Sequence, residues 1–225
     1  MEPSHAEVTT CRSPVCRCDI AAPNTRDSRR RKRKPPAMLS KPLSLLLVAV
    51  IMDMRPLLGQ VIDIGACPPV KVQEKLDPNK FSGKWFEIER TFARRSNQRL
   101  HCVSVEYYYD GQGKFSAVNS AVLPNGHTNR VLGELTILNH TEPAKMSMKF
   151  YARNPEQRPF WVLYTDYDKC AIVYRCRRSL WLHTMYVWIL CRNHTVTEPY
   201  LANLRGYVHQ WTGIPPRLFS KTPCK

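Results

Sequence analysis

Lys145-Met146-Ser147-Met148-Lys149-Phe150 alternates polar and apolar side chains without a break. A period of two is that of a β-strand, so Met146, Met148 and Phe150 share one face and the polar residues share the other. The apolar face is rich in methionine and aromatic groups, which adapt to irregular shapes. Such a face can pack as an ordinary β core or line a cavity, and the alternation alone leaves both interpretations open.

Residues 102–109 alternate in the same way, with Tyr107 and Tyr109 on the apolar face. β-rich segments recur about every ten residues along the chain, and turn sequences such as Asp110-Gly111 separate them. This pattern favours a β-sandwich or a barrel. We predict eight strands, at about residues 84–92, 102–109, 114–123, 129–138, 144–151, 160–166, 170–177 and 183–192.

One helix is predicted after the last strand. Thr197 is a suitable N-cap, and Pro199 in the first turn loses no hydrogen bond. The apolar residues that then recur at helical spacing are Leu201, Leu204, Val208 and Trp211. Gly213 ends the pattern, and we expect the helix to pack against the outside of the sheet.

The first 59 residues differ in composition from the rest. Residues 1–37 show no apolar period and include the basic run at residues 29–34. That run fits either a nuclear or nucleic-acid-binding signal or, as we favour, a disordered basic leader or gene-model extension. Residues 38–59 contain an apolar core too short to span a bilayer and are predicted to form a signal peptide, cleaved near Gly59. Residues 60–225 then form the folded domain.

The net charge of +16 depends strongly on that division. Residues 1–59 hold 11 of the 34 Lys and Arg residues and 5 of the 18 Asp and Glu residues, which leaves 23 and 13, or +10, for residues 60–225. These charges are scattered among apolar residues, so we expect no nucleic-acid partner. Disorder throughout is excluded, because 43% of the residues are apolar.

Six cysteines follow residue 60, and none of them belongs to a CxxC pair. We therefore expect no metal site, and a disulfide framework is the default for cysteines behind a signal peptide. The spacing does not choose among the pairings. Asn139 and Asn193 begin Asn-x-Thr triplets, which are acceptors for glycosylation in a secreted protein. Asn193 adjoins an apolar strand, where it could be occluded.

Three short motifs together resemble those of the lipocalin family. Gly83-Lys84-Trp85 opens the first predicted strand, Thr165-Asp166-Tyr167 ends the sixth, and Arg192 ends the eighth. The resemblance covers residues 60–224 and implies an all-β fold, an eight-stranded antiparallel up-and-down β-barrel with one C-terminal α-helix packed outside. It also implies that the motif tryptophan and arginine support the closed end of the barrel and do not contact ligand.

Within the family, Cys67-Pro68-Pro69 and residues 171–176 resemble the branch of apolipoprotein D and the arthropod lipocalins that bind bilins or carotenoids. That branch implies the disulfides Cys67–Cys176 and Cys102–Cys224. Cys170 and Cys191 depart from its pattern. They begin the seventh strand and end the eighth, so in an antiparallel hairpin they could form a third bridge.

The resemblance also implies a cavity for one small ligand and favours it over a filled core. Carried over one position at a time, the lining residues are Tyr107, Asn119, Phe150 and Trp188. Met146 and Met148 are added from the alternation alone. The first strand leaves one question open, because Glu87 and Glu89 share the phase of Trp85. Either a bulge shifts that phase or a carboxylate faces the cavity.

We therefore expect a secreted, extracellular carrier of a small hydrophobic ligand. The candidate ligands are a fatty acid or other lipid, a steroid, a retinoid, or a bilin or carotenoid pigment. The alternative is a lipocalin-type enzyme that acts on a lipid such as a prostaglandin, which would need an unpaired cysteine facing the cavity. No cofactor is expected, association with a lipoprotein or a membrane surface is left open, and the oligomeric state is not defined.

Overall fold

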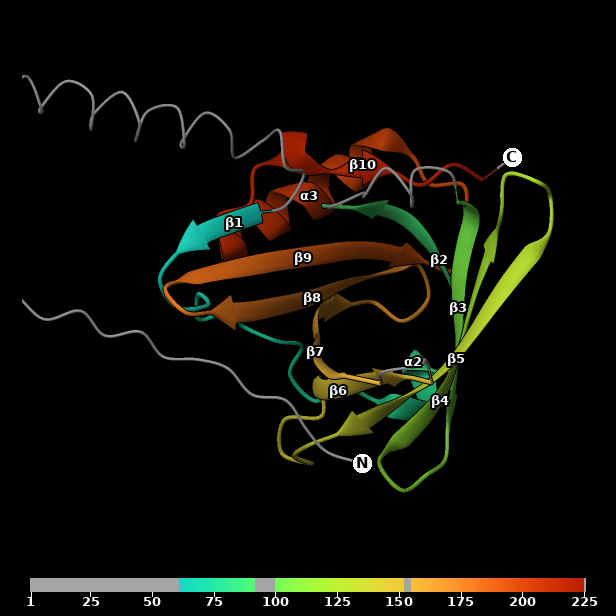
Figure 1. Cartoon of the computed structure of the whole chain (residues 1–225), viewed down its shortest axis with the longest axis horizontal. Coiled ribbons are helices and arrows are strands. Elements are labelled where there is room, and N and C mark those ends of the chain that lie inside the picture. The colour runs from blue at the N-terminus through green and yellow to red at the C-terminus, as the bar shows by residue number, and fades with distance from the viewer. Residues whose placement is uncertain (1–60, 92–99, 152–154, 225) are drawn as a thin grey trace, which may run out of the picture. The chain divides into compact units, whose positions relative to one another are not determined.

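A computed structural model of the 225-residue chain describes residues 61–91, 100–151 and 155–224. The expected leader at residues 1–37 and signal peptide at residues 38–59 lie outside these residues. Figure 1 shows strands curving around a common interior, with a long helix outside them. The wall strands are β2 (Gly83–Arg90), β3 (His101–Tyr109), β4 (Lys114–Val122), β5 (Thr128–Ile137), β6 (Lys145–Phe150), β7 (Gln157–Thr165), β8 (Cys170–Ser179) and β9 (Leu182–Cys191).

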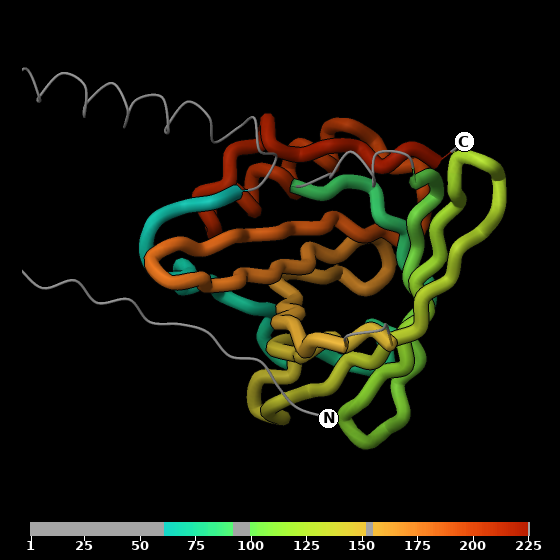
Figure 2. The backbone as a smooth tube through the Cα atoms, viewed as in Figure 1, coloured from blue at the N-terminus to red at the C-terminus, as the bar shows by residue number. Residues whose placement is uncertain are grey.

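Each wall strand pairs antiparallel with its neighbours in sequence, from β2 to β9 (Figure 2). β9 also pairs with β2, with Cys191 opposite Phe86, and this pairing closes the sheet into a barrel. The predicted eight-stranded antiparallel barrel is confirmed. The bounds of its strands differ from the predicted ones by three residues at most.

Two short strands extend the sheet beyond the barrel. β1 (Val61–Ile64) pairs with the start of β9, and β10 (Ser220–Lys221) pairs with the end of β2. β2 and β3 are paired only through residues 83–86 of β2, so the C-terminal segment takes the free edge of β2 where β3 departs. The Cys102 N–H donates to the Pro223 carbonyl at 2.8 Å, which holds this segment against β3 as well.

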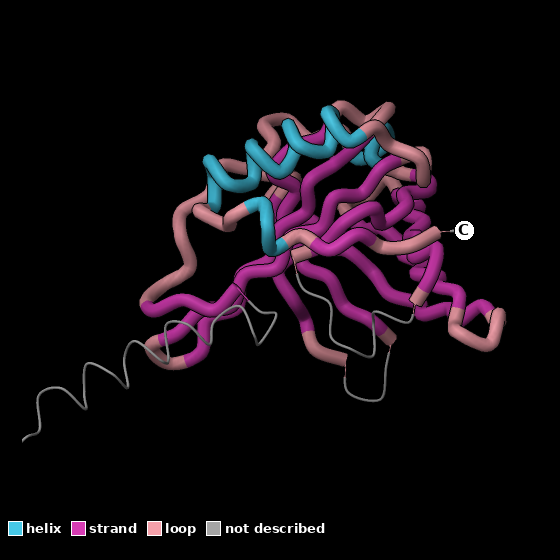
Figure 3. Tube along the Cα trace, turned by 90° about the horizontal axis from the view of Figure 1, so that it is seen from above, coloured by secondary structure: helices cyan, strands magenta, loops and turns pink. Residues whose placement is uncertain are grey.

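The helix α3 (Glu198–Thr212) lies across the outer side of the strands, as Figure 3 shows, and the predicted outer helix is confirmed. Thr197 takes the predicted N-cap position although its side chain makes no capping hydrogen bond, and Gly213 ends the helix with φ of 74°. The 3₁₀ helix η3 (Pro216–Leu218) then leads to β10. Among the described residues, no helix is long and apolar enough to cross a membrane.

Strand alternation divides the apolar side chains into two clusters. The outer cluster joins the barrel to α3 and includes Leu204 and Val208 of the helix with Ile172 and Ile189 of the wall. The inner cluster fills the closed end of the barrel. It includes Phe81, from the short helix α2 (Pro78–Phe81), together with Trp85, Tyr107, Phe115 and Phe160. The barrel therefore has a packed floor beneath its open end.

Three disulfides fasten the described chain. The Cys67–Cys176 bridge ties the segment after β1 to β8, and the Cys102–Cys224 bridge ties the C-terminal segment to β3. Cys170 and Cys191 lie opposite each other on β8 and β9 and form the third bridge, with Cα atoms 4.0 Å apart.

Candidate functional site

Arg192 joins the elements of the barrel floor. Its guanidinium lies over the Trp85 ring, 3.7 Å from the ring centre, in a cation–π contact. The same group donates hydrogen bonds of 2.8 to 3.0 Å to four backbone carbonyls, those of Lys80, Ser82, Lys84 and Tyr167. Gly83, with φ of 94°, leaves room for it, because an added Cβ would lie 3.2 Å from Arg192 Nη1. These groups support the floor and do not line the cavity.

The Thr165-Asp166-Tyr167 motif connects β7 to this floor. Asp166 Oδ1 accepts hydrogen bonds from the N–H groups of Lys169 and Cys170, at 2.8 and 2.9 Å. The Tyr167 hydroxyl accepts a 2.9 Å hydrogen bond from the Asp77 N–H, and Asp77 in turn caps α2. The motif therefore holds the turn before β8 and the short helix of the floor together.

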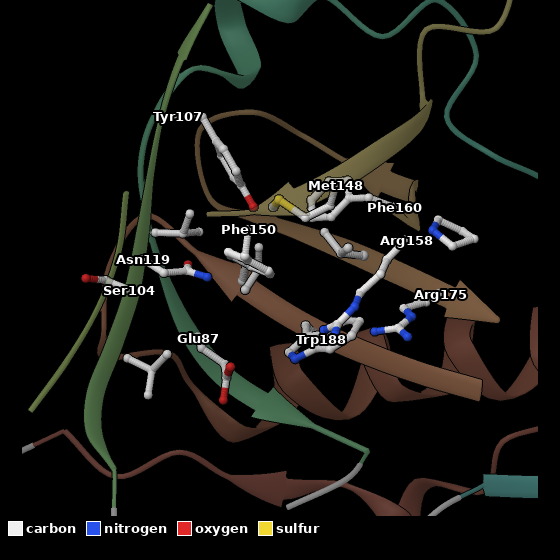
Figure 4. Close-up of a pocket in the computed structure, with 15 residues that line it drawn as sticks. Glu87, Ser104, Tyr107, Asn119, Met148, Phe150, Arg158, Phe160, Arg175 and Trp188 are labelled. Carbon is white, nitrogen blue, oxygen red and sulfur yellow. The ribbon is translucent and has the colours of Figure 1, made fainter. Parts of the chain in front are cut away.

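A cavity of about 190 Å³ lies within the barrel beside the packed floor (Figure 4). A more open hollow of about 370 Å³ shares Val103, Asn119, Phe150 and Arg158 with it. The residues that line the cavity are Glu87, Val103, Ser104, Val105, Tyr107, Asn119, Met148, Phe150, Arg158, Pro159, Phe160, Val173, Arg175, Trp188 and Leu190. Most of this lining is apolar, which suits a hydrophobic molecule.

The structure brings together five of the six residues predicted to line a cavity. They are Tyr107, Asn119, Met148, Phe150 and Trp188. Met146 is the exception: it faces the interior but is fully buried in the floor cluster, opposite Ile137 and Phe160. The prediction for Met146 is corrected, because alternation assigns a residue to a face and does not say how deep in the barrel it lies.

An irregular register in β2 answers the question about the first strand. Glu87 lies opposite Leu190 and lines the cavity. Glu89 lies opposite Ile189, whose side chain belongs to the outer cluster. Ile88 is the extra residue of a β-bulge that reverses the faces of the strand between the two acids. Both alternatives therefore hold, since a bulge is present and one carboxylate faces the cavity.

Glu87 is buried with its own cationic partner. Its Oε1 lies 3.2 Å from Arg90 Nε and accepts a hydrogen bond from the Thr222 hydroxyl of the C-terminal segment. Burial raises the pKa of Glu87 above its ordinary value, although Arg90 and Thr222 act in the opposite direction.

Two arginines of the lining were not predicted from the sequence. Arg158 shares the inward face of β7 with Phe160, and Arg175 shares the inward face of β8 with Val173. The same alternation that identified Met148 was a signal for both. Arg158 lies near the start of β7 and also lines the open hollow, whereas Arg175 lies in the middle of β8 and lines the cavity alone.

The cavity holds polar groups of two kinds. Tyr107 and Asn119 supply neutral ones, and burial raises the pKa of the Tyr107 phenol, so its hydroxyl stays protonated. Glu87, Arg158 and Arg175 supply charged ones. In the part of the chain that the structure describes, no group of three or more His, Cys, Asp or Glu residues is placed to hold a metal ion.

Both glycosylation triplets are exposed. Asn139 Oδ1 accepts hydrogen bonds from the N–H and the hydroxyl of Thr141, each at 2.9 Å. Asn193 is also exposed, so the prediction that the neighbouring strand could occlude it is wrong. Its side chain accepts a 3.0 Å hydrogen bond from the Thr195 N–H.

A closed antiparallel barrel of eight strands with an apolar cavity and a helix outside defines a class of small-molecule-binding proteins. Residues 82–215 match the model of the lipocalin / cytosolic fatty-acid binding protein family. The chain belongs to the lipocalin family, as its three motifs predict.

Known lipocalins are similar to the chain over most of the barrel. Apolipoprotein D of Bos taurus is 40% identical over 161 residues, which are 71% of this chain and 81% of that protein. Insecticyanin-B of Manduca sexta is 36% identical over 142 residues, which are 60% of this chain and 67% of that protein. The solved structure of insecticyanin from Manduca sexta covers 72% of this chain and 88% of its own, with a TM-score of 0.63 and 28% identity. The predicted similarity to this branch is confirmed.

Proposed function

We propose that this lipocalin is a secreted carrier that binds a small hydrophobic molecule in the barrel cavity. The apolar cavity of about 190 Å³ above a packed floor is the observation that carries the proposal. A fatty acid or other lipid, a steroid, a retinoid, or a bilin or carotenoid pigment has the required chemistry. The aromatic rings of Tyr107, Phe150 and Trp188 supply contact area, and the Asn119 amide orients the ligand through a polar group.

A retinol titration tests this proposal. Retinol bound beside Trp188 quenches tryptophan fluorescence, and we expect a saturable signal from the full chain produced under oxidising conditions. Trp188→Ala removes a ring from the lining and lowers the affinity at least tenfold. Trp181→Ala is the matched control, because Trp181 is 64% exposed in the turn between β8 and β9. The absence of saturable binding to the unchanged chain would count against the carrier.

Secretion is supported by the disulfides. Three bridges within one small barrel are typical of proteins that fold in an oxidising compartment. The proposed signal peptide at residues 38–59 supplies the route to that compartment. We expect N-terminal sequencing of the product from the medium of expressing cells to begin near Gln60. Retention of the chain inside those cells contradicts this part of the proposal.

The cysteines also favour a carrier over an enzyme. The alternative needs a free thiol in the cavity, and each of the six cysteines in the described residues is bridged. A thiol titration of the folded barrel is expected to find none of these six reactive. Incubation with prostaglandin H₂ is expected to give no isomerised product beyond that of buffer.

Association with a lipoprotein or a membrane surface is the second part of the proposal. Leu180 and Trp181 are 85% and 64% exposed, and Arg177 and Arg178 precede them on β8. Apolar side chains next to cations suit an anionic lipid surface. We expect flotation with phosphatidylserine vesicles, and loss of flotation in Leu180→Ser/Trp181→Ser. Equal recovery of the unchanged protein and the double variant with the vesicles contradicts a role of Leu180 and Trp181 in lipid binding.

A further inference from the structure

Two arginines enter the cavity from neighbouring strands. Figure 4 shows Arg158 and Arg175 on the same side of the cavity, near Trp188, with Glu87 on the opposite side. Arg158 of β7 lines both the cavity and the open hollow, and Arg175 of β8 lines the cavity. The guanidinium groups therefore lie where the apolar interior meets the open end.

The acids of these two hollows do not balance the arginines. Glu87 is already paired with Arg90 at 3.2 Å. Glu156 is the other acid of the lining, and its carboxylate lies 3.4 Å from Arg158 Nε and 4.0 Å from an Arg177 nitrogen. One carboxylate is thus shared by two cations before Arg175 is counted. With Arg90 and Arg177, which pair with these acids from outside the lining, four arginines meet two acids around the described hollows.

That charge is partly removed from water. The Nε atoms of Arg158 and Arg175 are buried, and neither makes a hydrogen bond to the described residues, since the 3.4 Å contact of Arg158 Nε with Glu156 is an ion pair without hydrogen-bond geometry. Burial lowers the pKa of Arg175, and the charge of Arg158 lowers it further, so the two groups are close enough to repel each other. An arginine remains a cation in proteins, and its planar group matches a carboxylate in geometry and charge. An anion placed between the two groups relieves the repulsion.

Aromatic rings fix the position of Arg175. Its guanidinium carbon lies 5.1 Å from the centre of the Tyr186 ring, and Tyr186 is its direct partner across β8 and β9. The Tyr186 ring stacks on that of Trp188, with centres 6.0 Å apart and planes 15° from parallel. The cation is held at the edge of a flat aromatic surface, which can contact the chain or ring system of a ligand.

We propose that the cavity binds a carboxylate-bearing amphiphile, with its apolar part toward Tyr107 and Met148 and its carboxylate between Arg158 and Arg175. This inference rests on the proposed carrier function and specifies its ligand as an acid and not a neutral lipid or a sterol. Tyr107, Met148, Phe160, Val173 and Leu190 form the apolar end. The bound carboxylate receives charge-assisted hydrogen bonds from both guanidinium groups.

The test compares two ligands that differ only in the head group, all-trans-retinoic acid and all-trans-retinol. Tryptophan quenching measures both affinities for the full chain and for Arg158→Gln/Arg175→Gln. We expect the unchanged protein to bind the acid about 10 to 100 times more tightly than the alcohol. In the double variant the affinity for the acid falls to that for the alcohol, and an unchanged circular dichroism spectrum reports an intact fold. Dodecanoate is expected to displace bound retinoid from the unchanged protein better than dodecanol does.

Arg178→Gln is the matched control, because it removes one positive charge from the same strand at an exposed position outside the lining. It should leave the preference for the acid intact. Equal binding of retinoic acid and retinol by the unchanged protein, or a preference that survives in the double variant, overturns the inference and leaves the carrier function standing. Binding of neither ligand overturns the carrier function and the inference with it.

Discussion

Glu87 and Glu89 point to opposite sides of the barrel wall, although residues two apart on a regular strand point to the same side. The bulge at Ile88 turns Glu87 into the cavity and Glu89 toward α3. On the outer side, Glu89 forms an ion pair with Arg205 of the helix at 2.7 Å. Because of the bulge, Glu87 lines the cavity and Glu89, two residues later, binds α3 on the outside of the barrel.

The Glu89–Arg205 pair yields a prediction about the attachment of α3. The Glu89 side chain is 2% exposed and that of Arg205 is 15% exposed, so Arg205→Ala leaves a buried carboxylate without its cation. We expect a loss of about 3 kcal/mol in the free energy of unfolding at pH 7. Burial raises the pKa of Glu89, so the carboxyl takes up a proton as the pH falls and the loss becomes smaller. Urea denaturation at pH 7 and pH 5 measures both effects, with the exposed Arg217→Ala as control.

The Glu87 carboxyl predicts a pH dependence of stability. Its pKa is raised by burial above the ordinary 4.5, so the folded protein binds this proton more tightly than the unfolded chain does. Stability contributed by the protonated group is present below pH 4.5 and is lost as the pH rises through the folded pKa. Glu87→Gln removes that dependence. We expect the variant to gain stability relative to the unchanged protein as the pH rises from 4.5 to 7.5.

Denaturant unfolding at several pH values measures this difference. Glu89 is common to both proteins, so its titration affects the two curves in the same direction. A stability difference that is constant with pH argues against a raised Glu87 pKa in the folded state.

Arg192→Lys is predicted to weaken the floor while the charge is kept. A lysine ammonium cannot donate to four carbonyls and lie flat over the Trp85 ring at the same time. We expect a loss of about 2 kcal/mol in the free energy of unfolding. The control is Arg178→Lys, an exposed change on β8 for which no effect is expected. Equal stability of the two variants would show that charge alone maintains the floor.

Gly133→Ala is predicted to disturb the cavity through its neighbour Phe150. Gly133 lies opposite Phe150, and an added Cβ would be 2.7 Å from the Lys149 carbonyl oxygen and 3.0 Å from a Phe150 ring carbon. We expect a loss of about 2 kcal/mol in stability, because β5 and β6 must separate. Retinol affinity also falls, since Phe150 lines the cavity.

Gly206→Ala serves as the control for this change. Gly206 lies in α3, and its added Cβ meets no atom within 4 Å, so we expect a gain of about 0.5 to 1 kcal/mol from helix propensity. A stable Gly133→Ala variant that binds retinol normally would show that β5 and β6 can accommodate the added methyl group.

Much of the barrel could be predicted because its signals are local. Alternation in residues 145–150 and the turn chemistry between strands depend on neighbours in sequence, and they located the strands closely. The prediction of the floor depended on three short motifs, two of which meet where the Arg192 guanidinium donates a hydrogen bond to the Tyr167 carbonyl. The strand and turn signals are set by local backbone geometry, whereas the contacts of the floor join distant residues and were expected only from the family resemblance.

The rest of the site depends on distances that alternation does not contain. Met146 and Met148 look equivalent in sequence and both belong to the inner cluster, but only Met148 lines the cavity. The bulge at Ile88 arises from the register between β2 and β9, which are nearly 100 residues apart in sequence. Arg158 and Arg175 suggest an anion site only because they line the same cavity, and the sequence does not show that they do.

The packed floor beneath the cavity affects which substitutions the barrel can tolerate. Arg192 and Trp85 secure the base and lie outside the cavity lining, whereas Arg158, Arg175 and Trp188 line the cavity and do not belong to the base. Substitutions among the second set can therefore alter selectivity while the scaffold persists. The same separation allows natural divergence or laboratory redesign to recruit the barrel for new cargo.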